Sequence, residues 1–185
     1  MILAKRLTLS SCIALLLVAF GSFAQTDKRA ERRTDTYEGL HISIYLDKAS
    51  YRFGDLATLR VVLTNVGDSP ITIYKGLGWG CLGSLGYGLT DSRGRGLMPT
   101  FIPGSFYSPP FPKEDFITLK PGEAVHTQRR MQIGRQEGIR QPGTYQVTVW
   151  YNNPVSQDFA PEGVKVWRIE NEDLVARRVR FTVTR

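Results

Sequence analysis

The residues that could act as nucleophiles or bases are few. Beyond the N-terminal region the chain has one cysteine, Cys81, and two histidines, His41 and His126. A thiol nucleophile needs a histidine within hydrogen-bonding reach, and the spacing of these three residues gives no reason to expect that contact. Lone cysteines more often pack as small apolar side chains. A thiol enzyme using Cys81 is therefore the least supported functional hypothesis, and we expect no catalytic residues.

Metal and nucleotide chemistry find little support either. The histidines, the cysteine and the scattered carboxylates do not have the spacing of zinc or calcium ligands. Residues 78–83, GWGCLG, match the dinucleotide pattern G-x-G-x-x-G, but that site needs a helix to begin there. Residues 84–88, SLGYG, have no helical character. Aromatic residues do not interleave with the arginines of 129–140 and 177–180, as single-strand binding would require. We expect no metal, no cofactor and no nucleic acid.

Aromatic residues give the better functional lead. Trp79 and Tyr87 lie in a stretch with six glycines from Gly76 to Gly88, which we interpret as a loop, and further aromatics stand among the prolines of residues 99–112. Exposed aromatics on loops at the end of a fold are favoured anchors for partners. The alternative is that they pack as a lid over the core, as most aromatics do. The candidate partner-binding residues are Trp79, Tyr87, Phe106, Tyr107 and Phe111.

The N-terminal residues predict export. Lys5 and Arg6 precede the apolar run 13–20, and Ser22-Phe23-Ala24 supplies the small-x-small pattern of a cleavage site, so residues 1–24 are expected to be a cleaved signal peptide. The apolar run is too short to remain as a span of about 20 residues. We expect a periplasmic or secreted protein with no membrane span after cleavage. Without Lys5 and Arg6, 22 basic and 17 acidic residues remain, a net charge of +5.

From His41 onward, segments of the chain alternate apolar and polar residues with a period of two. Residues 25–38 are polar and predict a flexible leader, and residues 39–185 are expected to form one domain. With Cys81 alone, no internal disulfide is possible, so the hydrophobic core must hold the domain. We predict an all-β fold, a single immunoglobulin-like antiparallel β-sandwich of about seven strands with long glycine- and proline-rich loops. Within each expected strand, one face is shared by the residues Ile42, Ile44 and Leu46; Leu59, Val61 and Leu63; Tyr145, Val147, Val149 and Tyr151; and Val179, Phe181 and Val183.

Turn motifs between these strands carry a family resemblance. Tyr51-x-x-Gly-Asp, Leu59-x-Val-x-Leu-Thr-Asn, Leu119-x-Pro-Gly-Glu and Pro142-Gly-Thr-Tyr resemble the immunoglobulin-like modules of bacterial exported proteins. The pattern, over most of residues 40–151, is also similar to the BsuPI proteinase-inhibitor type of domain. The resemblance implies a non-catalytic binding or accessory module of the bacterial envelope, whose partner is another envelope or extracellular protein. The alternative it implies is a proteinase inhibitor. The sequence leaves the partner's identity and the oligomeric state open.

Overall fold

The computed structural model describes residues 35–80, 83–97, 111–169 and 173–185. In these ranges the regular structure consists of strands and short 3-10 helices. The elements are β1 (Thr36–Tyr37), β2 (Leu40–Leu46), β3 (Ser50–Arg52), β4 (Leu56–Asn65), β5 (Ile71–Tyr74), β6 (Leu85–Asp91), η2 (Lys113–Asp115), β7 (Phe116–Leu119), β8 (Ala124–Gln132), η3 (Arg135–Glu137), β9 (Gly143–Tyr151), η4 (Gln157–Phe159), β10 (Leu174–Val175) and β11 (Val179–Thr184).

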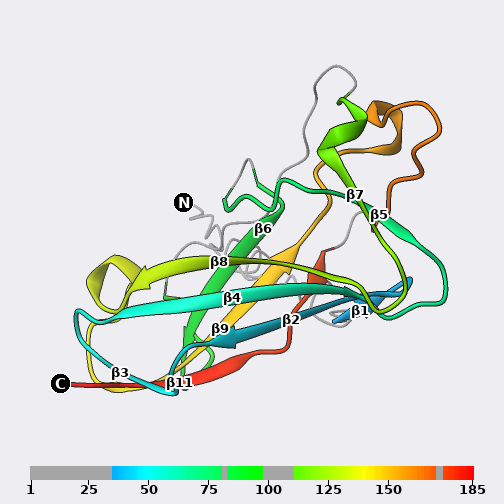
Figure 1. The fold of residues 1–185 in the computed structure, drawn as a ribbon. Helices are drawn as coiled ribbons and strands as arrows, with labels where there is room; N and C mark the ends of the chain where they lie inside the picture. Colours follow the sequence, from blue (N-terminus) through cyan, green and yellow to red (C-terminus); the bar gives the residue numbers. More distant parts are fainter. Residues whose placement is uncertain (1–34, 81–82, 98–110, 170–172) are drawn as a thin grey trace, which may run out of the picture. The chain divides into compact units, whose positions relative to one another are not determined.

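The strands form two main sheets that face each other, and the predicted β-sandwich is confirmed (Figure 1). One sheet has the order β1-β2-β4-β8, and the other has the order β10-β9-β11-β3 with β6 also paired to β9. All pairs are antiparallel except β11 with β3. The described residues contain more strands than the seven or so expected, because β1, β3 and β10 are too short to show an alternation.

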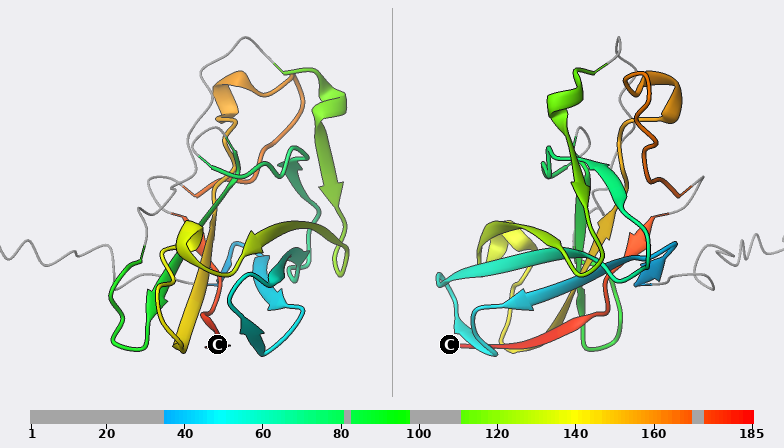
Figure 2. Two further views of the ribbon diagram at one scale, coloured as in Figure 1. Left: turned by 90° about the vertical axis from the view of Figure 1, so that its left-hand side faces the viewer. Right: turned by 45° about the vertical axis from the view of Figure 1, so that its right-hand side comes forward.

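A small third sheet, β5 with β7, lies at one end of the sandwich (Figure 2). Beside it runs the segment between β9 and β10, joined to it by a parallel bridge between Thr72 and Val166. This end of the molecule therefore consists of short paired segments from three separate parts of the chain.

The period-two alternation correctly predicts the core. The even residues of β2 and the odd residues of β4 and β9 point between the sheets, where each apolar side chain excludes water. Phe181 and Val183 of β11 join them, with Tyr51 packed edge-on against Phe181. These side chains form one continuous cluster, which is the main source of stability for a domain of this size.

The Tyr51-x-x-Gly-Asp motif builds the corner that precedes β4. The Tyr51 hydroxyl donates to Asp47 Oδ1 at 2.8 Å, and the Arg52 N–H donates to Asp55 Oδ2 at 2.8 Å. Gly54 has φ of +90°, a conformation that favours glycine. The motif residues thus satisfy the backbone of a tight turn, which explains why they indicate a fold and not a function.

Asn65 at the end of β4 ties three segments together. Its side-chain amide donates to the carbonyls of Ser69 and Leu119, both at 2.8 Å, and its Oδ1 accepts the Gly67 N–H at 3.0 Å. The side chain is fully buried, so these bonds satisfy polar atoms that water cannot reach. Asn65 therefore fixes the 66–70 loop, which forms one wall of the groove described below.

The expected leader extends further than the structure supports. Thr36 and Tyr37, assigned to the leader from sequence, pair with His41 and Leu40 as strand β1. Two residues flanked by polar neighbours give no periodic signal, so sequence alone could not separate this strand from a leader. The predicted signal peptide lies outside the described residues. Within those residues, no helix is long and apolar enough to cross a membrane.

Candidate functional site

The structure corrects the loop interpretation for Tyr87, which lies within strand β6. Alternate residues of β6, Leu85, Tyr87 and Leu89, are buried against the core, and all of β6 pairs with β9. The intervening glycines disguise this strand, because they remove the polar face that would have completed the alternation. Tyr87 is 4% exposed, so in this conformation it presents almost no surface to a partner.

Tyr87 belongs to an enclosed group that we call the arginine–aromatic cluster, formed by Trp79, Tyr87, Arg129 and Glu137. The Trp79 and Tyr87 rings meet edge to face, with centroids 6.0 Å apart. The Arg129 guanidinium lies over both rings, 4.5 Å from the Tyr87 centroid and 5.8 Å from that of Trp79. Such cation–π contacts add to the stability of a packed group.

Hydrogen bonds link the polar ends of this cluster. The Tyr87 hydroxyl donates to Glu137 Oε2 at 2.9 Å and accepts from Arg129 Nη2 at 3.2 Å. Glu137 is a buried carboxylate on η3, and a buried charge is tolerated only when it is paired or hydrogen-bonded. Burial, and then the negative charge of Glu137, raise the pKa of Tyr87. The hydroxyl therefore stays protonated and continues to donate to the carboxylate.

The other aromatic candidates are not placed in this cluster. Phe111 packs edge-on against Tyr74, with centroids 5.5 Å apart, and Tyr74 also contacts Phe116. Phe106 and Tyr107 lie outside the described residues, as does Cys81. The structure therefore brings together two of the five predicted residues, Trp79 and Tyr87, and adds Arg129 and Glu137, which sequence reasoning did not select.

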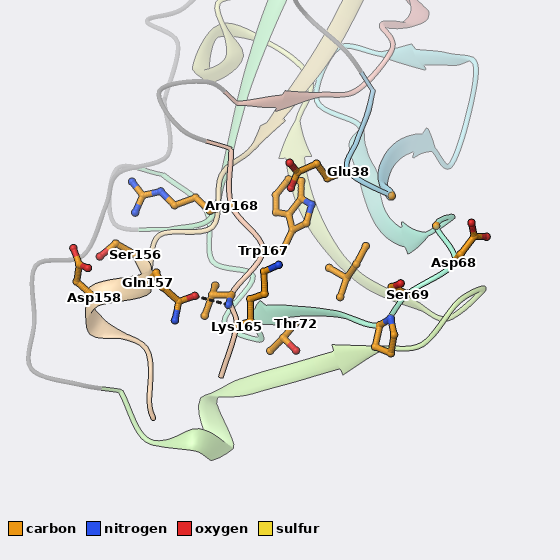
Figure 3. Close-up of a pocket in the computed structure, with 15 residues that line it drawn as sticks. Glu38, Asp68, Ser69, Thr72, Ser156, Gln157, Asp158, Lys165, Trp167 and Arg168 are labelled. Atoms are coloured by element: carbon orange, nitrogen blue, oxygen red, sulfur yellow. Dashed lines mark hydrogen bonds between the residues drawn. The ribbon is translucent and has the colours of Figure 1, made fainter. Parts of the chain in front are cut away.

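A groove of about 940 Å³ lies at the β5 end of the sandwich (Figure 3). We call it the Trp167 groove. The 66–70 loop and β5 form one wall, the region of η4 forms the other, and the extended segment 165–168 lies between them. Its volume is at the upper end of the range of about 300–1,000 Å³ that is typical of ligand pockets. Its lining residues are Glu38, Gly39, Gly67, Asp68, Ser69, Pro70, Ile71, Thr72, Ser156, Gln157, Asp158, Lys165, Val166, Trp167 and Arg168.

The backbone around Trp167 is held on both sides. The Trp167 N–H donates to the Thr72 carbonyl at 2.8 Å, and the Trp167 carbonyl accepts from Asn153 Nδ2 at 2.8 Å. Gln157 accepts the Val166 N–H and donates to the Val164 carbonyl, at 2.9 and 2.8 Å. A segment of irregular structure is thus fixed as firmly as a strand, which is the kind of support that binding sites need.

The indole of Trp167 is almost completely enclosed. Tyr151 stacks on the ring with centroids 5.9 Å apart, Tyr37 meets it edge-on at 6.3 Å, and the residue is 7% exposed. Its Nε1–H is buried and has no hydrogen-bond partner among the described residues. A buried donor without an acceptor costs about 1–3 kcal/mol, so Trp167, which lines the groove, carries an unsatisfied polar group.

Unpaired acidic side chains surround the groove. Glu38, Asp68 and Asp158 are exposed, and within the described parts of the chain none of them takes part in an ion pair. Glu38 is also the one described non-glycine residue with a positive φ, +42°. Such strained conformations concentrate at functional sites. Lys165 is the matching exposed cation, and it shares the Trp167 side of its extended segment, two residues away.

Sequence reasoning did not find the Trp167 groove. Residues 152–169 show no periodic pattern that would place Trp167 beside β5. The groove depends on the bridge between Thr72 and Val166, residues far apart in sequence. The signal that was available is composition, because a tryptophan, a lysine and an arginine stand close together at positions 165–168.

The described residues show no group of three or more histidine, cysteine or carboxylate side chains arranged to hold a metal. His41 lies near Asp35, with Nδ1 4.0 Å from Oδ1, and also contacts the Thr36 hydroxyl at 2.9 Å. His126 is exposed on β8. Because Cys81 is outside the described residues, the thiol hypothesis stays a prediction.

The two facing sheets define the chain as a β-sandwich protein. No family model matches the sequence, and no curated protein matches it. Solved structures show distant similarity to β-sandwich domains. One is the CARDB domain of a Pyrococcus furiosus protein, 14% identical, covering 85% of this chain and 97% of that one with a TM-score of 0.38.

Two longer proteins show similarity of the same order. Spo0M, the sporulation control protein from Bacillus subtilis, is 11% identical over 80% of this chain and 50% of its own, with a TM-score of 0.42. The alkylpurine DNA glycosylase AlkC from Pseudomonas fluorescens is 16% identical over 81% of this chain, with a TM-score of 0.41, and this chain spans 32% of its length. These likenesses concern the fold alone and assign no family.

Proposed function

We propose that this protein is a non-catalytic binding module of the bacterial envelope, exported to the periplasm or beyond, and that it holds its partner in the Trp167 groove. The observation that carries the proposal is the buried, unsatisfied Nε1–H of Trp167 on the lining of a groove of about 940 Å³. Folded proteins leave few buried donors without acceptors. An acceptor on a bound partner would satisfy this one.

The finer family assignment is part of the same proposal. We regard the chain as an immunoglobulin-like module similar to the BsuPI type, supported by the turn motifs. Asn65 holds the β4–β5 turn against Leu119. Glu123 Oε2 accepts the Lys120 N–H at 2.8 Å across the Pro121-Gly122 turn. These bonds give the motif residues a structural task, which fits a module that uses a common frame for its own partner.

The partner is another envelope or extracellular protein. The aromatic surface proposed from sequence, Trp79, Tyr87, Phe106, Tyr107 and Phe111, remains a second proposed contact region. For Tyr87 that role requires the arginine–aromatic cluster to open, because Tyr87 is enclosed by Arg129 and Glu137. The buried Trp167 Nε1–H also requires local movement before a partner can reach it, but the groove that Trp167 lines is already open, and for that reason we place the primary site there.

In-cell crosslinking tests the proposal. A photo-reactive residue at exposed position 69, on the rim of the groove, should capture one dominant partner, identified by mass spectrometry after purification of the tagged protein. The matched control carries the same residue at position 128, which is exposed on β8 and outside the groove. Equal capture from both positions, or no specific product from position 69, would reject the groove as the primary site.

A further inference from the structure

We propose that the Trp167 groove takes an extended peptide segment that carries lysine or arginine side chains, with a backbone carbonyl of the peptide accepting the Trp167 Nε1–H. This inference rests on the proposed function and names the chemistry of the partner at that site. Three observations carry it: the position of the unsatisfied indole donor, the covering of the indole faces, and the charge around the groove.

The indole donor requires an acceptor that can reach a buried edge. Trp167 is fixed through its backbone N–H to Thr72 and its carbonyl to Asn153, so the ring cannot turn to find another partner without breaking packing. In Figure 3 the ring lies among the groove side chains, with Glu38 on one side of it and Lys165 on the other. A peptide carbonyl is a strong hydrogen-bond acceptor, and the Lys165 ammonium group can donate a hydrogen bond to the same peptide.

The covered faces of the indole argue against a sugar ring as the ligand. Recognition of a flat apolar group uses the exposed face of an aromatic ring. Tyr151 stacks on the Trp167 ring, with an interplanar angle of 27°, and Tyr37 meets it edge-on, at 74°. The indole therefore offers a hydrogen-bond donor but no exposed ring face on which a sugar could stack. Pro70 and Ile71 supply small apolar contacts on the neighbouring wall, as the side chains of an extended peptide would require.

The charge of the groove selects basic side chains. Three carboxylates line the groove, Glu38, Asp68 and Asp158, and they are exposed and without ion pairs among the described residues. Two cations line it as well, the exposed Lys165 and the half-buried Arg168, so the carboxylates are in excess by one. The chain as a whole has a net charge of +7, so a locally acidic groove departs from the rest of the surface. Unpaired carboxylates beside a groove attract cationic ligands and repel phosphates and acidic chains. Lysine or arginine side chains on the peptide would therefore reach Glu38 or Asp158 while its backbone meets Trp167.

A displayed library of random ten-residue peptides, selected on the purified mature protein, tests the proposal. Selected peptides should contain more lysine and arginine than the input library. A synthetic copy of the most enriched peptide should weaken about tenfold on W167F, since one hydrogen bond to a buried donor is lost. It should also weaken on the double variant E38Q/D158N, with a smaller dependence of affinity on salt. The matched control, E114Q/E162Q, removes two exposed carboxylates outside the groove and should bind unchanged.

The indole N–H resonances of the wild-type protein provide a second measurement, in which variants serve only to assign the signals. The chain has three tryptophans, and the Trp167 signal, assigned with W79F and W150F, should move downfield on titration with the synthetic peptide while the Trp150 signal stays. The inference is overturned if no peptide is selected, or if the selected peptides are not enriched in lysine and arginine. Equal binding to both double variants would overturn it as well. So would a Trp167 shift with chitohexaose, a sugar chain that serves as the comparison ligand, and none with the peptide. If position 69 still captures a protein in cells, the binding module stands and only its ligand class is wrong.

Discussion

Trp79 and Trp167 both bury an indole N–H that has no acceptor, but the two regions differ in what surrounds that donor. Around Trp79, hydrogen bonds run from Arg129 to Tyr87 and from Tyr87 to Glu137 inside the enclosed arginine–aromatic cluster, where Arg129 Nε is also buried without a partner among the described residues. Around Trp167, three exposed carboxylates, those of Glu38, Asp68 and Asp158, have no ion pair among the described residues and line an open groove. Aromatic content alone pointed to the first region. The open groove and its exposed carboxylates are the reason that we propose the second region as the ligand site.

The largest effect should come from removing the ring at the centre of the arginine–aromatic cluster. Tyr87→Ala should lower the free energy of unfolding by about 3–5 kcal/mol, because it empties a buried aromatic site and leaves Glu137 with fewer donors. Denaturant unfolding measures the loss, and Tyr45→Ala, at a tyrosine that is 56% exposed, is the control. Unchanged stability combined with lost partner capture would make this cluster the contact surface.

A matched pair of tyrosine-to-phenylalanine variants should distinguish the two regions, because the free energy of unfolding should fall in one variant and stay the same or rise in the other. Tyr87→Phe removes a hydroxyl with two partners and should lower the free energy of unfolding by about 1–3 kcal/mol. Tyr151→Phe removes a buried hydroxyl without a partner, next to Trp167. It should leave stability unchanged or raise it by about 1 kcal/mol, because no hydrogen bond is lost. Equal losses of stability in both variants would show that the hydroxyls of Tyr87 and Tyr151 contribute alike.

Alkaline pH should weaken the fold through the buried tyrosines. Burial and Glu137 raise the pKa of Tyr87, and burial alone raises that of Tyr151. A phenol whose pKa is higher in the folded state than in the unfolded chain, where it is about 10, contributes stability below that pH and loses it as the pH rises toward the folded value. Urea unfolding between about pH 9 and pH 11 should therefore show falling stability.

Two variants assign that pH dependence to the two regions. Glu137→Gln removes the negative charge beside Tyr87 and should reduce the alkaline loss from the arginine–aromatic cluster. Tyr151→Phe should remove the loss that arises next to the groove and leave the contribution of Tyr87 in place. Identical slopes in the wild type and Glu137→Gln would show that Glu137 does not govern the titration of Tyr87.

The smallest effect on stability should come from the rim of the groove. Asp68→Asn changes an exposed side chain without an ion pair among the described residues, so the free energy of unfolding should stay within about 0.5 kcal/mol. Affinity for a basic peptide should fall nonetheless, since an attracting charge is removed. Calorimetric titration compares the two proteins. A clear loss of stability with unchanged affinity would assign Asp68 to the scaffold.

The sequence predicted the β-sandwich fold far better than the Trp167 groove. Alternation identified the inward faces of β2, β4, β9 and β11, because burial on one side of a strand imposes a period of two. It missed β6, where glycines replace the polar residues beside Tyr87. It also missed Thr36–Tyr37, a strand of two residues. The Trp167 groove was beyond reach, since it depends on Asn65, Gln157 and Asn153 fixing segments that have no repeating pattern.

The order of the second sheet sets when this protein can fold. Strand β11 (Val179–Thr184) lies between β9 and β3 and pairs with both, so it is made after both of the strands that it joins. Until its residues emerge from the ribosome, the facing edges of β9 and β3 have no neighbour and the core lacks Phe181 and Val183. The second sheet therefore stays incomplete until β11 has been made. Such a delay would keep the chain unfolded for the export that we propose.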